Sequence, residues 1–155
     1  MVTTALMAVT LCFVGCFRKE VCSKTPEIEF GSFSKNTMRQ DSRDTFTIRI
    51  KFKDGDGDLG DNRTESTAKN VFIVDSRDGF IQPYHLKPFS IITSECINGT
   101  MDFILKSSCC VDAYGQPCDA AQATRDTLQY LITIQDAAGN ISNQIKTPDI
   151  YLICR

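Results

Sequence analysis

Two segments of this chain alternate strictly between apolar and polar side chains. The pattern runs through 45–53, TFTIRIKFK, and returns in 127–135, TLQYLITIQ. Because successive side chains of a strand point to opposite faces of a sheet, a period of two predicts strands with one buried face. The inward residues are expected to be Phe46, Ile48, Ile50 and Phe52 in the first segment and Leu128, Tyr130, Ile132 and Ile134 in the second.

Shorter apolar runs between turn signals complete the pattern. Pro83 and Pro88 limit one run to a broken or edge strand, and Asn98-Gly99 is typical of a hairpin turn. About seven short strands and no amphipathic helix predict an antiparallel immunoglobulin-like β-sandwich over 27–155. Besides the two alternating segments, strands are expected over 27–33, 71–75, part of 80–92, 100–107, and within 141–154 with an interruption near Pro148, while 34–44 and 108–126 are expected to be loops.

The N-terminal segment has the features of an export signal. Residues 1–15 carry no charge, and Cys16 follows directly. A helical membrane span needs ~20 apolar residues, so this shorter run better suits a signal peptide. The stretch Phe13-Val14-Gly15-Cys16 is similar to a bacterial lipobox. We therefore expect a signal peptide over 1–15, a lipidated Cys16 and a polar tether over 16–26. The alternative is a buried N-terminal strand or helix.

Composition excludes several classes of function. The 155 residues include 17 Lys and Arg and 19 Asp and Glu, for a net charge of −2, which argues against a nucleic-acid partner. The single histidine, His85, makes histidine-based metal sites and Ser-His-Asp chemistry improbable. Eight cysteines favour an oxidising compartment.

The cysteines are expected to form structural disulfides. Removal of Cys12 with the signal and of Cys16 to lipid leaves six, and no C-x-x-C spacing occurs among them. Because successive strands of a sandwich run in alternate directions, Cys22 and Cys96 are expected at one end of it. The other end is expected to hold Cys109, Cys110, Cys118 and Cys154. Adjacent cysteines rarely bond each other. The expected pairs are Cys22–Cys96, then Cys154 with either Cys109 or Cys110, and Cys118 with the one that remains.

An acidic loop follows the first alternating strand. Residues 54–65 hold five acids and one base, for a local charge of −4. Asp54, Asp56 and Asp58, with Asn62 and Glu65, have the spacing of a calcium-binding loop. Leu59 stands where such a loop needs glycine, and a strand precedes it, so an EF-hand is not expected. Two interpretations stay open: a weak calcium site, or a solvated acidic turn.

The direction of the two alternating strands brings a second loop to this place. The strands run the same way in an immunoglobulin-like topology, so the loops that follow them leave the sandwich at the same end. Asp136 and Asn140 are therefore expected near the acidic loop. If calcium binds, Asp136 would be an added ligand, since the ion takes ~6–8 oxygens.

Three features together resemble a known group of proteins. They are the lipobox, the segment FKDGDGDLG (52–60), and the closing segment from Asp126 to Pro148 with its DAAGNISN stretch. This combination resembles small surface or periplasmic lipoproteins of the Bacteroidetes, which carry an immunoglobulin-like domain and mostly have no assigned function.

The expected function follows from these features. It is a non-catalytic binding or structural module of the bacterial cell envelope, lipid-anchored through Cys16 to the outer membrane, on a face that stays undecided. Calcium is the one candidate cofactor, and the partner would be an unidentified envelope protein or glycan. The alternatives are an envelope hydrolase that uses carboxylates such as Asp54 and Asp56, and a calcium-stabilised accessory subunit of a larger envelope complex.

Overall fold

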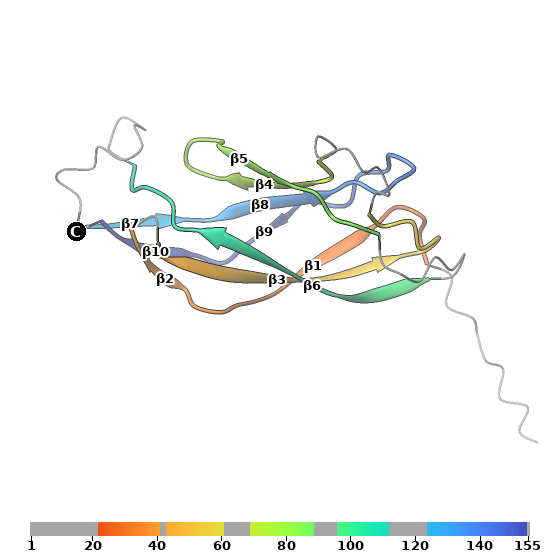
Figure 1. Cartoon of the computed structure of the whole chain (residues 1–155), viewed down its shortest axis with the longest axis horizontal. Coiled ribbons are helices and arrows are strands. Elements are labelled where there is room, and N and C mark those ends of the chain that lie inside the picture. The colour runs from red at the N-terminus through yellow and green to blue at the C-terminus, as the bar shows by residue number, and fades with distance from the viewer. Residues whose placement is uncertain (1–21, 41–42, 61–68, 89–95, 112–123, 155) are drawn as a thin grey trace, which may run out of the picture.

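The computed structural model describes residues 22–40, 43–60, 69–88, 96–111 and 124–154. These residues form ten strands in three sheets (Figure 1) and contain no helix that is long and apolar enough to cross a membrane. The strands are β1 (Glu27–Phe33), β2 (Thr37–Arg39), β3 (Thr45–Asp54), β4 (Val71–Asp75), β5 (Ile81–Tyr84), β6 (Ile97–Lys106), β7 (Arg125–Leu128), β8 (Tyr130–Ile134), β9 (Ile145–Lys146) and β10 (Ile150–Ile153).

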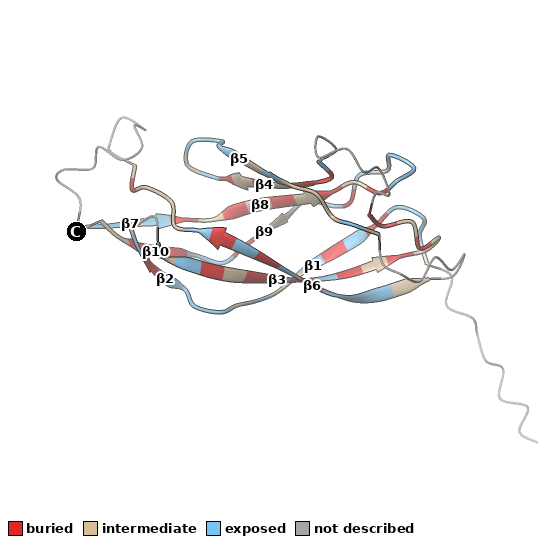
Figure 2. Cartoon of the chain, viewed as in Figure 1, coloured by how far each residue is buried: buried red, intermediate tan, exposed pale blue. Residues whose placement is uncertain are grey.

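One layer of the fold is the antiparallel sheet β1-β3-β6. Its central strand β3 is the first alternating segment, extended by one residue to Asp54. All four apolar residues predicted to point inward from this strand are buried, and the residues between them are more exposed (Figure 2). The predicted strand over 27–33 is confirmed as β1.

The other layer contains the sheets β5-β4-β8-β9 and β2-β10-β7. Their strands β7 and β8 are one stretch of chain interrupted at Gln129, whose carbonyl accepts a hydrogen bond from the Ser76 backbone N–H. Strands β9 and β10 are likewise separated around Pro148, as the sequence predicts. The core lies between the layers, where the rings of Phe46 and Tyr130 stack with centroids 6.1 Å apart.

The strand count departs from the prediction. The fold is all-β and mostly antiparallel, but it has ten strands in three sheets rather than about seven. The predicted loop 34–44 contains β2, which pairs parallel with β10. This strand of three residues has one buried side chain, Met38, and so shows no periodicity that a sequence pattern could reveal.

The predicted hairpin turn at Asn98-Gly99 is wrong. Both residues lie inside β6, where they pair with Lys53 and Phe52 of β3. A Cβ at Gly99 would lie 3.2 Å from the Phe52 ring, so the glycine makes room for an aromatic ring on the neighbouring strand. Its role here is to allow close packing rather than to make a turn.

Two of the expected disulfides are present, one toward each end of the fold. Cys22 bonds Cys96, and Cys154 bonds Cys110, which was one of its two expected partners. Cys109 is disulfide-bonded as well, while Cys118 lies outside the described residues. The predicted signal peptide (1–15) and lipidation site (Cys16) also lie outside them.

Candidate metal centre

The acidic loop begins inside the sheet. Asp54 is the last residue of β3 and pairs with Ile97 of β6. It continues the alternation that buries Phe52, two residues earlier, and it has no exposed surface. The strand therefore places a carboxyl group at a position where its own pattern calls for an apolar side chain.

The loop then folds back toward this buried carboxylate. The backbone N–H of the buried Leu59 donates a hydrogen bond to Asp54 Oδ2 at 3.1 Å. Gly57 and Gly60 adopt positive φ angles of 72° and 105°. These two glycines make the tight turns of the loop, although Leu59 stands where a calcium-binding loop has its glycine. As a result, carboxylate oxygens of Asp54, Asp56 and Asp58 all lie within 4.8 Å of one another.

The second loop meets the first, as the strand directions predict. The backbone N–H groups of Ala137 and Ala138 donate to the Asp58 carbonyl and to Asp58 Oδ2, at 3.2 and 3.0 Å. Asp136 is buried, and its two carboxylate oxygens accept hydrogen bonds of 2.7 Å from the backbone and side-chain nitrogens of Asn140. This turn fixes the Asp136 carboxylate while leaving lone pairs on both oxygens. We call Asp54, Asp56, Asp58 and Asp136 the acidic cluster.

Within the described part of the chain, three oxygens of the acidic cluster have no hydrogen-bond donor. Asp54 Oδ1, Asp56 Oδ1 and Asp58 Oδ1 are each buried and accept no hydrogen bond from a described residue. Buried polar atoms are nearly always paired, because an unpaired one loses the hydrogen bonds that water gave it. Three such atoms in one loop are therefore unfavourable as they stand.

The charges of the cluster are also unfavourable when no proton or cation is bound. Burial, with repulsion from Asp56, Asp58 and Asp136, raises the pKa of Asp54 to about 6. Burial and the charges of Asp136 and Asp56 also raise the pKa of Asp58. Each carboxylate makes ionisation of its neighbours harder. A proton or a cation would relieve this repulsion.

The donor set fits a hard divalent cation. The cluster offers carboxylate oxygens only, which suit Ca²⁺ or Mg²⁺ better than the softer metals that prefer nitrogen or sulfur. Asp54, Asp56, Asp58 and Asp136, four of the predicted ligands, are brought together. The other two, Asn62 and Glu65, lie outside the described residues. Sequence reasoning missed that Asp54 is buried, although its place in the alternation of β3 gave the signal.

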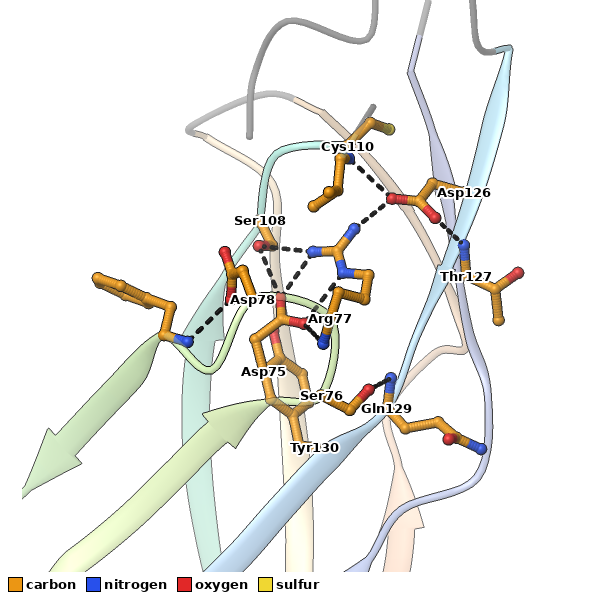
Figure 3. A network of polar contacts seen from close by, with 12 residues as sticks. Asp75, Ser76, Arg77, Asp78, Ser108, Cys110, Asp126, Thr127, Gln129 and Tyr130 are labelled. Atoms are coloured by element: carbon orange, nitrogen blue, oxygen red, sulfur yellow. Dashed lines mark hydrogen bonds and ion pairs between the residues drawn. The ribbon is translucent and has the colours of Figure 1, made fainter. Parts of the chain in front are cut away.

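A second group of buried charges lies at the other end of the β4–β8 pair. Val71 of β4 pairs with Ile134 of β8 near the acidic cluster, whereas Asp75 pairs with Tyr130 at the far end. There Asp75, Arg77, Ser108 and Asp126 form what we call the Arg77 network (Figure 3).

The Arg77 network is fully connected. Arg77 donates from Nε and Nη2 to the two oxygens of Asp75, at 3.0 and 2.6 Å, and from Nη1 to Asp126. Asp126 Oδ2 also accepts from the Val111 backbone N–H at 2.9 Å. Ser108 contacts both Arg77 and Asp75. Sequence reasoning missed this network, whose acids lie far apart along the chain and carry no local motif.

Comparisons of the chain with protein-family models, with curated proteins and with solved structures gave no match.

Proposed function

We propose that this chain is a lipid-anchored, non-catalytic binding or structural module of the bacterial cell envelope, an immunoglobulin-like β-sandwich stabilised by calcium. The observation that supports calcium is the set of three buried Oδ1 atoms, in Asp54, Asp56 and Asp58, that accept no hydrogen bond from a described residue. A Ca²⁺ ion takes ~6–8 oxygens and neutralises carboxylates held close together. Asp136 lies against Asp58 and supplies a further carboxylate.

Burial of the cluster supports a structural rather than a catalytic role. A general acid or base must reach the proton that it transfers, directly or through one water. Asp54 has no exposed surface, and the free oxygens of Asp56 and Asp58 are buried too. A groove of about 440 Å³ lies elsewhere, on the β1-β3-β6 sheet beside Glu27, Lys51 and Thr100. Its lining includes none of the four aspartates.

The envelope location is supported by the cysteines. The disulfides Cys22–Cys96 and Cys110–Cys154 suit an oxidising compartment. Cys22 is bonded to Cys96 and Pro26 is buried, so the proposed tether 16–26 is held against the domain from Cys22 onward, and 16–21 would link the domain to a lipidated Cys16. The two layers of sheet, with the core between them, support the sandwich architecture.

Thermal unfolding in calcium and in chelator tests the calcium part of this proposal. Wild type should unfold at a higher temperature in millimolar calcium, because a ligand that binds only the folded chain stabilises it by mass action. The double variant Asp56→Asn with Asp58→Asn should lose this response. In chelator it should be at least as stable as wild type, because two repelling charges are gone.

The matched control removes two acidic charges elsewhere. Asp102 and Asp149 lie at the surface, away from the cluster, and contact Arg49 and Gln129. Asp102→Asn with Asp149→Asn should keep the full calcium response. A wild-type midpoint that is the same in calcium and in chelator would return the acidic loop to a turn without a metal.

A further inference from the structure

One disulfide lies directly against the acidic loop. A Cβ built on Gly55 would lie 2.6 Å from the Cys22 carbonyl oxygen and 2.3 Å from that of Ser23. The backbone at 22–23 therefore crosses immediately over the residue that follows Asp54. Only glycine permits so close an approach.

The partner cysteine lies directly before β6, the strand that pairs with β3. Cys96 immediately precedes Ile97, which pairs with Asp54 at the end of the β3–β6 ladder. The bond Cys22–Cys96 thus ties the N-terminal segment to the start of β6, next to the residue that pairs with the buried Asp54. It closes a loop with a sequence separation of 74 residues.

The segment between Cys22 and β1 is exposed at three of its four positions. Ser23, Lys24 and Thr25 are exposed, the Thr25 N–H donates to Ser23 Oγ within the segment, and Pro26 is buried just before β1. Chain ends fray unless they are tied down. The disulfide is the covalent tie at this place.

We propose that the Cys22–Cys96 disulfide assembles the cation site, so that the oxidised chain binds calcium and the dithiol form binds it much more weakly. This inference rests on the proposed calcium site, which stands on the fully buried Asp54 and on its Oδ1, an atom with no donor in the part of the chain that the structure describes. Without the bond, the segment 22–26 leaves Gly55, water reaches Asp54, and the ligands lose their fixed arrangement. Pre-organisation of the ligands is what gives an incomplete loop its affinity.

The chemistry is a thiol–disulfide exchange. On oxidation, the two thiols of Cys22 and Cys96 give two electrons and two protons to the disulfide of an oxidant, which becomes a dithiol as the new S–S bond forms. Such oxidants act outside the reducing cytosol. The cation site would therefore mature only after export.

Two matched disulfide variants test the inference on the full chain, purified from an exporting host. Cys22→Ser with Cys96→Ser should weaken Tb³⁺ or Ca²⁺ binding by at least about tenfold, since the removed tie constrains the site itself. Cys110→Ser with Cys154→Ser removes a disulfide at the other end and should change the affinity by less than about twofold, as distant sites act independently. Circular dichroism shows that each variant is folded.

A glycine substitution tests the same contact with every cysteine in place. Gly55→Ala would push the 22–23 backbone away from the loop and should also weaken binding, even if the serine variant fails to fold. Equal affinity of wild type, the Cys22/Cys96 variant and Gly55→Ala would overturn the inference while leaving the calcium site intact. A wild type that binds neither ion would overturn the calcium site, and the inference with it.

Discussion

The two ends of the β4–β8 pair bury aspartates in different ways. In the Arg77 network, Asp75 and Asp126 share one guanidinium, and both oxygens of Asp75 have donors. In the acidic cluster, Asp54, Asp56 and Asp58 have an oxygen each with no donor among the described residues. Buried charge is stable only when it is paired. Arg77 pairs with the buried carboxylates at one end, whereas those at the other end are arranged for a cation from solution.

The largest expected effect on the free energy of unfolding comes from removing the guanidinium of the Arg77 network. Arg77→Met keeps much of the side-chain volume but leaves Asp75 buried without its partner, which typically costs ~3–5 kcal/mol. The free energy of unfolding in urea should fall by about this amount, equally in calcium and in chelator. Arg49→Met removes an exposed pair with Asp102 and should cost less than ~1 kcal/mol. A loss for Arg77→Met that is as small as for Arg49→Met would remove the contrast between the two ends.

A smaller effect should appear in the pH dependence of the metal-free chain. Because the pKa of Asp54 is raised from 3.8 to about 6, the folded state binds more protons than the unfolded state between these values. Its contribution to stability is therefore lost as pH rises from about 4 to about 7. Lys35 and Arg49 lower the pKa values of Asp44 and Asp102, respectively. These two groups therefore make the chain more stable as pH rises, and they do so at a lower pH than the Asp54 window.

Urea unfolding in chelator across this pH range measures the effect, with Asp54→Asn as the control. Wild type should lose stability through the window, and the variant should lose less. Calcium should reverse the wild-type trend, because the ion binds deprotonated carboxylates and its stabilisation grows with pH. The same slope in wild type and variant would show that Asp54 does not differ from an ordinary carboxyl.

The sequence predicted most of the fold because most of it is periodic. The alternation of β3 and of β7–β8 identified their buried faces correctly, since all eight residues predicted to point inward are apolar and buried. Strand β2 has a single buried residue and no periodic pattern, so the sequence did not predict it. Gly99 was misread because a glycine that makes room for a ring looks, in sequence, like one that makes a turn.

The candidate site was predicted in part. Strand direction correctly placed Asp136 beside Asp58, because direction alone decides where a loop leaves a sheet. The burial of Asp54 and the contact between Gly55 and the N-terminal segment depend on packing between distant parts of the chain. The Arg77 network depends on Asp126, which lies 49 residues from Arg77, and no local pattern signals such a pair.

The most direct test of the calcium site is a calorimetric titration of the metal-free, oxidised full chain with calcium near pH 7. We expect one ion per chain with a Kd on the order of 10⁻⁴–10⁻³ M, as in extracellular modules. Asp54→Asn should bind far more weakly, and Asp102→Asn should bind like wild type. A wild type that shows no saturable binding, or binding unchanged by Asp54→Asn, would contradict the claim that the acidic cluster is a cation site.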